Sequence, residues 1–120
     1  MNAADQRSVR KAKQRERQER DQELKDLRDV LSTRQGRRFI WRTLTLAGVF
    51  RLSFVPGEPE ETAFNEGRRS LGLSLMADVH EIDAAQYIQM ANEANGETLA
   101  RADELEPVNT ESLTEEHYNA

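Results

Sequence analysis

The sequence predicts an all-α fold: a small helical hairpin or bundle of about three core helices, with a long basic N-terminal helix and an acidic C-terminal tail. Apolar residues recur at spacings of three and four in segments separated by Gly, Pro and Ser, which is typical of helices packed on one face. Charge is divided along the chain: residues 1–42 carry 13 Lys and Arg against 7 acids, and residues 43–120 carry 4 against 15.

This division indicates three segments. Residues 1–23 form a basic N-terminal arm or helix extension, residues 24–95 form a helical core, and residues 96–120 form an acidic tail. A core of that size is marginally stable, so we expect it to associate with partners. The chain has no cysteine, no apolar run long enough to span a bilayer and no apolar signal-peptide core, which fits a reducing aqueous compartment.

The first segment consists of good helix formers but has no apolar stripe. Residues 8–21 contain neither Gly nor Pro, and they place charges of both signs at helical spacing, for example Glu16 and Arg20. Such a helix is either solvated or ordered by nucleic acid or by an acidic protein surface. Its candidate contacts are Arg10, Lys11, Lys13 and Arg17. From Leu24 to Leu31 a narrow apolar seam follows, and this seam requires a partner helix.

A buried helix is predicted after residue 33. Ser32 or Thr33 can cap its start, and Gly48 stands where a left-handed C-terminal residue is favoured. Gly36 in the first turn indicates a close approach of another backbone. Together with the next helix, this segment is expected to supply the core packing residues, which are Phe39, Ile40, Trp41, Leu44, Phe50, Phe64, Gly67, Leu71 and Leu75.

Residues 51–58 are expected to be a loop, because Pro56 and Pro59 bracket Gly57. A second core helix should run from Pro59 or Thr62 to about residue 80, and its small residues suit an antiparallel pair in which aromatic side chains fill the space.

A third helix should begin at Asp83, with Gln86 as its capping-box partner. Asn95 and Gly96 are expected to end it. Further short helices are conceivable within 98–104 and 110–118, but neither could bury much apolar surface.

Arginines form the most distinctive polar cluster. Arg34, Arg38 and Arg42 share one helical face, Arg37 lies beside them, and Arg68 and Arg69 can add to them from the second helix. They could bind phosphates or an acidic protein surface. The alternative is pairing with acids of the chain itself, such as Asp26, Asp29, Glu66 or the acidic tail.

Motifs for catalysis are missing. There is no nucleophile elbow, phosphate-binding glycine loop or His-Glu-x-x-His sequence. Neither His80 nor His117 has a second ligand at metal-binding spacing. The sequence therefore predicts no enzyme activity, no cofactor, no metal and no small-molecule substrate.

Four short stretches carry a family resemblance: Leu31-Ser32-Thr33, Gly36 to Trp41, Ala47 to Phe50, and Phe64 to Gly72. Over roughly residues 25–92 the chain resembles the Bbp19-like family, which is named from a Bordetella phage and is encoded in the structural gene modules of short-tailed bacteriophages. The resemblance implies a virion or virion-assembly protein, made in the bacterial host cytoplasm.

Within that family we expect a protein docked at the portal or head-to-tail interface, or carried inside the head as an ejection protein. Its expected partners are other virion proteins, further copies of itself and, non-specifically, packaged DNA. Two other classes stay open. One is a scaffold or assembly chaperone that is absent from mature virions, and the other is a small DNA-binding regulator.

Overall fold

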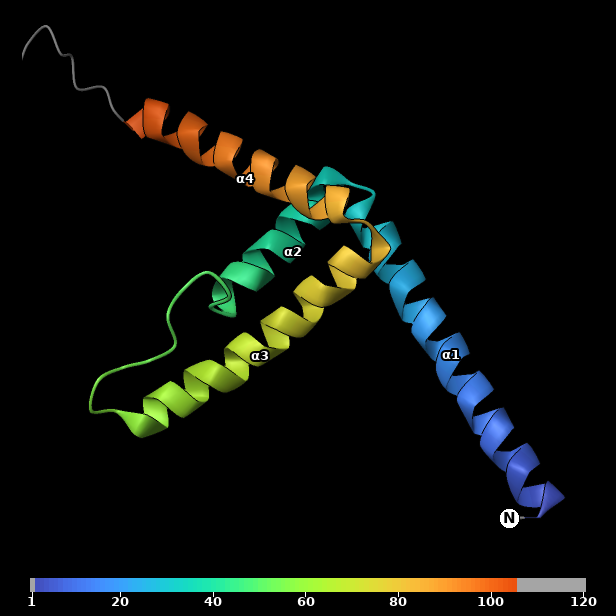
Figure 1. The fold of residues 1–120 in the computed structure, drawn as a ribbon. Helices are drawn as coiled ribbons and strands as arrows, with labels where there is room; N and C mark the ends of the chain where they lie inside the picture. Colours follow the sequence, from blue (N-terminus) through green and yellow to red (C-terminus); the bar gives the residue numbers. More distant parts are fainter. Residues whose placement is uncertain (1, 106–120) are drawn as a thin grey trace, which may run out of the picture.

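The computed structural model describes residues 2–105. In that range the chain forms four helices and no strand: α1 (Ala3–Leu31), α2 (Arg34–Leu46), α3 (Pro59–Ile82) and α4 (Ala84–Leu105) (Figure 1). The predicted all-α class is therefore confirmed. The acidic tail is described only as far as Leu105, and the short helix considered for 110–118 lies outside the described residues.

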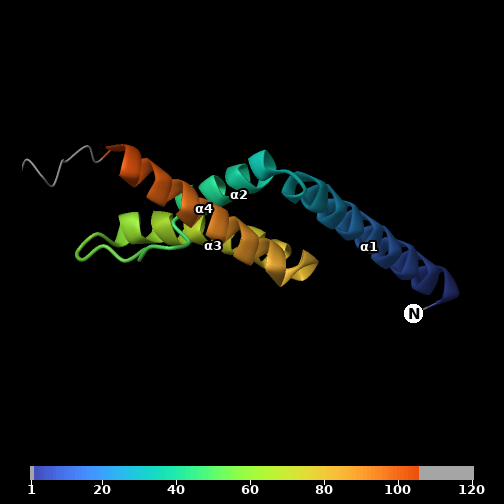
Figure 2. The same ribbon diagram turned by 90° about the horizontal axis from the view of Figure 1, so that it is seen from above.

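α1 is one uninterrupted helix of 29 residues, in which the basic arm and the apolar seam are continuous. The side chain of Asn2 caps it by accepting a hydrogen bond from the Asp5 amide at 2.9 Å. Its C-terminal end contacts the rest of the molecule, whereas its N-terminal half extends away from the body (Figure 2).

The junction between α1 and α2 is a sharp turn at Ser32 and Thr33. Thr33 is extended, and its hydroxyl accepts a hydrogen bond from the Gly36 amide at 3.0 Å. A Cβ atom on Gly36 would lie 1.7 Å from the carbonyl oxygen of Val30, so the expected close backbone approach is confirmed. At the other end of α2, Gly48 has a φ of +80° and turns the chain out of the helix.

The loop between α2 and α3 is held to α3 by the polar side chains of Thr62, Asn65 and Glu66, the last of which accepts a hydrogen bond from the Ser53 hydroxyl. The Val55 amide donates to the Thr62 hydroxyl at 2.9 Å, and the Asn65 side chain donates to the Ser53 carbonyl at 3.1 Å. Gly57 supplies the second positive φ angle, +75°. The loop then leads into α3, whose first turn contains Pro59 and the acids Glu60 and Glu61.

α2 and α3 run antiparallel, and α4 crosses α2 on its way out of the body (Figure 1). α1 and α3 meet near their C-terminal ends and diverge from there, so the two helices form a V (Figure 1). The core lies near the apex of the V, where all four helices come together. Its buried apolar side chains are Leu31, Ile40, Leu44, Ala47, Val79 and Met90.

An aromatic row borders this core. Trp41 is partly buried and stacks on Phe50, with 4.9 Å between ring centroids. Its other neighbour is Tyr87 of α4 at 6.0 Å, and Tyr87 in turn lies 4.8 Å from His80 of α3. The row thereby links α2, α3 and α4 beside the buried cluster. Leu75 is also partly buried against the core.

Four of the large side chains expected in the core are exposed, which corrects the prediction: Phe39 (56%), Phe50 (46%), Phe64 (68%) and Leu71 (75%). Phe39 points away from the core, because it lies about 100° around α2 from Ile40 and about 140° from Leu44. Phe64 and Leu71 are exposed because α1 leaves α3 before reaching them.

The glycines of α3 also differ from expectation. A Cβ on Gly67 would meet nothing within 4 Å, so this residue receives no packing partner. Gly72 is the point of close approach, and a Cβ there would lie 2.6 Å from both the Cβ of Ala47 and the Cγ2 of Val49. The space beside Gly72 is therefore filled by the small aliphatic side chains of Ala47 and Val49, rather than by the aromatic rings that the sequence predicted.

The third core helix is longer than predicted. α4 passes through Asn95 and Gly96 and continues to Leu105. Gly96 does not have a positive φ angle, and a glycine inside a helix costs only about 1 kcal/mol relative to alanine. At the start of α4, the Asp83 side chain accepts a hydrogen bond from the Ala85 amide at 2.9 Å. The expected capping-box bond between the Gln86 side chain and the Asp83 amide is not formed. The Asp83 amide donates to the Val79 carbonyl instead.

Candidate interaction surfaces

Arg37 fastens three helices together. Its guanidinium makes a bidentate pair with the carboxylate of Glu93 on α4, with the shortest nitrogen–oxygen distance at 2.9 Å. It also donates at 2.9 Å to the carbonyl of Leu31, at the end of α1. Both charged side chains are largely covered, with 12% and 22% of their surface exposed. The hydrogen bond from Arg37 lowers the pKa of Glu93 and raises that of Arg37 itself.

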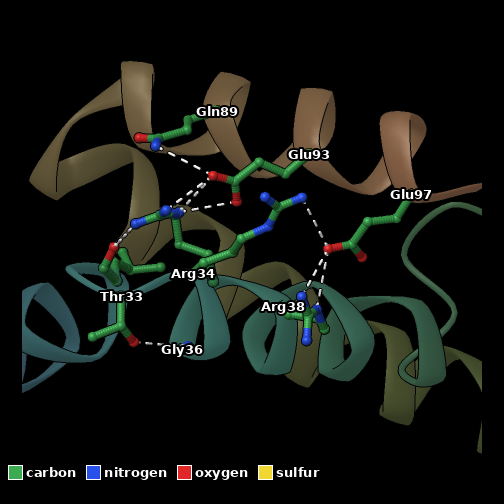
Figure 3. A network of polar contacts seen from close by, with 9 residues as sticks. Thr33, Arg34, Gly36, Arg38, Gln89, Glu93 and Glu97 are labelled. Carbon is green, nitrogen blue, oxygen red and sulfur yellow. Dashed lines mark hydrogen bonds and ion pairs between the residues drawn. The ribbon is translucent and has the colours of Figure 1, made fainter. Parts of the chain in front are cut away.

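Glu97, one turn farther along α4, lies between two other arginines of α2 (Figure 3). Arg38 donates to it at 3.0 and 3.1 Å, and Arg34 at 3.4 Å. Three of the four α2 arginines considered for partner binding therefore have carboxylate partners inside the chain. The acids are Glu93 and Glu97. Glu97 belongs to the segment predicted as the acidic tail, so pairing with the tail is confirmed for Arg34 and Arg38, whereas Asp26, Asp29 and Glu66 are not the partners. The cavity beside this network is about 20 Å³, room for about one water molecule.

A second ionic contact joins α1 to α3. Arg20 donates to Asp78 at 2.6 Å and to Glu81 at 2.8 Å, and it also pairs with Glu23 of its own helix at 3.3 Å. The sequence reasoning did not single out Arg20. The signal was present, because Arg20 shares the spacing of three and four with Leu24, Leu27 and Leu31.

The same register continues beyond Arg20 as a basic seam, defined here as Arg10, Lys13 and Arg17. These residues follow one another at spacings of three and four. They lie on the same side of α1 that contacts the body near the C-terminal end of the helix. All three are exposed, and within residues 2–105 none forms an ion pair. Lys11 is also exposed but faces away from the seam. The seam is thus a row of cations in line with an existing helix interface.

Two exposed faces combine an aromatic ring, a cation and a leucine. On α2, Arg42 lies 5.5 Å from the ring centre of Phe39, with Leu46 exposed one turn on. On α3, Arg68 lies 5.7 Å from the ring centre of Phe64, with Leu71 exposed beyond it. Arg69, the remaining arginine of the predicted set, is half-buried. Clustered exposed apolar side chains of this kind mark protein interaction sites.

Residues 2–105 contain no group of three His, Asp or Glu side chains placed to hold a metal ion. None of the four helices combines the length and the apolar character needed to cross a bilayer.

The fold and these surfaces define a small all-α protein whose ion pairs tie helices together and whose large apolar side chains are in part exposed. Residues 27–92, more than half of the chain, match the family of Bbp19-like phage proteins. The protein belongs to this family, and it is therefore a bacteriophage protein. No curated protein and no solved structure matches the chain.

Proposed function

We propose that this protein is a non-enzymatic component of the phage particle, docked at the portal or head-to-tail interface or carried inside the head as an ejection protein. It acts through contacts with other virion proteins. The basic seam and the neighbouring cations of α1 also allow non-specific contact with packaged DNA.

The exposed aromatic faces carry this proposal. Phe39 and Leu46 on α2, and Phe64 and Leu71 on α3, together present four large apolar side chains to solvent, whereas residues 2–105 bury only six apolar side chains. A free-standing protein gains little from such exposure, whereas a subunit of a larger assembly buries these residues against its neighbours. Membership in a phage family supports the phage particle as that assembly.

Mass spectrometry of purified virions tests the location. We expect the chain in mature particles, in a fixed ratio to the portal protein. Particles that have released their DNA distinguish the two sites: an ejection protein is lost with the genome, and a portal-docked protein is retained. Absence from mature virions would contradict the proposal.

An assembly chaperone is the second candidate, and the long projecting α1 favours it because such an arm can bridge other subunits before they assemble. Comparing procapsids with virions separates the two functions, since a chaperone is present only in procapsids. A DNA-binding regulator is distinguished by sequence preference. The proposed particle protein binds random and phage DNA equally, with an affinity that falls steeply with salt.

A further inference from the structure

One face of α3 carries a continuous stripe of which the chain covers only half. The stripe follows spacings of three and four and consists of Glu60, Phe64, Gly67, Leu71, Leu75, Asp78 and Ile82. At its C-terminal end Leu75 and Ile82 pack against the core, and Asp78 binds Arg20. At its N-terminal end Phe64 and Leu71 are exposed. The covered and free halves belong to one surface, and coverage stops where α1 diverges (Figure 1).

α1 has the complementary arrangement. Its seam is apolar where it meets the body, becomes ionic at Arg20, and continues outward as Arg10, Lys13 and Arg17, where no other helix lies beside it (Figure 2). Residues 3–19 contain 6 Lys and Arg against 3 acids. Residues 58–71, which span the free half of the α3 stripe, contain 4 acids, all within 58–66, and 2 bases, Arg68 and Arg69, so the two halves carry opposite net charges. The two free halves therefore match in charge, and each continues an interface already formed within the chain.

We propose that the free half of α1 in one copy of this protein docks on the free half of the α3 stripe in a second copy. The cations of the basic seam pair with Glu60 and Glu61 in the same way as Arg20 pairs with Asp78 and Glu81. Their long aliphatic stems cover Phe64 and Leu71. Gly67 leaves room for these stems, because no atom lies within 4 Å of where its Cβ would be.

The geometry selects a second copy over folding back. α1 is one straight helix that points away from the free stripe of its own chain, so it cannot reach that stripe without breaking. Two basic seams cannot face each other, because their like charges repel. The contact is consequently head-to-tail, and repeated copies close into a ring or extend as a filament. This inference goes beyond the particle role and is tested on the isolated protein.

Association of the purified full-length chain provides the first test. Light scattering at rising concentration should show oligomers at about 50 mM salt that weaken at about 500 mM, because exposed charge pairs are screened. The triple variant Arg10→Glu/Lys13→Glu/Arg17→Glu should weaken association about tenfold or more. Its matched control, Ser8→Glu/Lys11→Glu/Arg15→Glu/Gln18→Glu, makes the same change in net charge on the other side of the helix and should associate like the native chain. Circular dichroism checks that both variants keep their helices.

A charge exchange then identifies the partner surface. The variant Glu60→Lys/Glu61→Lys should also fail to associate with itself. Mixing this variant with Arg10→Glu/Lys13→Glu/Arg17→Glu should restore association, because the acidic α1 of one chain then faces the basic α3 of the other. Equal loss of association in the seam variant and in its matched control, or a native chain that is monomeric at every concentration, overturns the proposal. A monomer in which the seam variant alone loses binding to random duplex DNA overturns it as well and makes the seam a phosphate-binding surface.

Cysteine cross-linking supplies a second readout that does not depend on affinity. The native chain has no cysteine, so introduced thiols react only with each other. A mixture of the Lys13→Cys and Gly67→Cys chains should yield a disulfide-linked heterodimer on mild oxidation. Lys11→Cys, on the opposite face of α1, should not couple to Gly67→Cys. Equal coupling of both α1 variants contradicts the proposed contact.

Discussion

Arg20 of α1 and Asp78 of α3 are 58 residues apart in the sequence, and their side chains are joined by a 2.6 Å hydrogen bond. This contact is the last that α1 makes with α3 before the two helices diverge, since the residues that precede Arg20 in α1 are exposed. Glu81 adds a second acceptor at 2.8 Å, one turn along α3. The Arg20 contact therefore sets where the body of the molecule ends and the projecting helix begins.

Arg20→Ala should loosen α1 without unfolding the body. With the ionic contact removed, amides of residues 17–24 should exchange with solvent faster, and those around Leu44 should be unchanged. Hydrogen exchange measured by mass spectrometry checks this. Arg17→Ala is the matched control, because Arg17 has no ion pair within residues 2–105, and it should leave the exchange pattern as it is.

The pair Arg37 and Glu93 should be coupled more strongly than Arg38 and Glu97. Arg37 and Glu93 are more completely covered and bidentate, and Arg37 also satisfies the carbonyl of Leu31. Double-mutant cycles with alanine, followed by denaturant unfolding, measure both coupling energies. Equal coupling in the two cycles would show that neither coverage nor the bidentate geometry strengthens the pair.

The contribution of Glu93 should depend on pH in a defined direction. Arg37 holds the pKa of this carboxyl below its ordinary value of 4.5, so folding favours the ionised form. The resulting stability is fully present above pH 4.5 and is lost as the pH falls through the lowered pKa. The melting temperatures of the native chain and of Glu93→Gln should therefore differ at neutral pH and converge in acid. A difference that persists in acid contradicts this prediction.

Two glycines of the same helix should respond oppositely to alanine. Gly67→Ala adds a methyl group into open space and should stabilise the protein by about 0.5–1 kcal/mol, because alanine favours helices. Gly72→Ala places a Cβ 2.6 Å from Ala47 and Val49 and should destabilise it by about 1–3 kcal/mol through overpacking. Chemical denaturation of the two variants under the same conditions compares them directly.

Two leucines separate folding from association. Leu44 is fully buried, and Leu44→Ala should cost about 2–5 kcal/mol of unfolding free energy. Leu71 is 75% exposed, and in dilute solution Leu71→Ala should stay within about 0.5 kcal/mol of the native chain. A large loss from Leu71→Ala in the dilute monomer would mean that this face is already covered within one chain.

Local signals in the sequence located most helix boundaries. Thr33 caps α2, Gly48 turns the chain out of it, and Pro59 lies in the first turn of α3, because each of these residues acts through its own backbone or its nearest neighbours. The prediction that Gly96 ends α4 was wrong because it also relied on a local signal. A glycine can end a helix or be carried within it, and here Glu97, held by Arg34 and Arg38, anchors the helix just beyond the glycine.

The pairing of apolar faces could not be predicted in the same way. Periodicity identified the apolar stripe of α3 that contains Phe64 and Leu71. It did not indicate that α1 would cover only the C-terminal end of this stripe. Similarly, the arginine face of α2 was visible, whereas its acceptors Glu93 and Glu97 depend on how α4 crosses α2. Both outcomes are set by crossing angles between helices, which the order of residues within one helix does not fix.

The part of α1 that precedes Arg20 acts as a lever arm. Its 17 residues from 3 to 19 reach about 25 Å from their last anchor, and a regular helix of that length transmits a tilt with little bending. A change of about 10° in the crossing angle at the apex displaces its tip by roughly 4 Å. Small adjustments among the side chains at the apex therefore become large displacements of the N-terminal tip, and the same fold can hold this tip at different distances from the body.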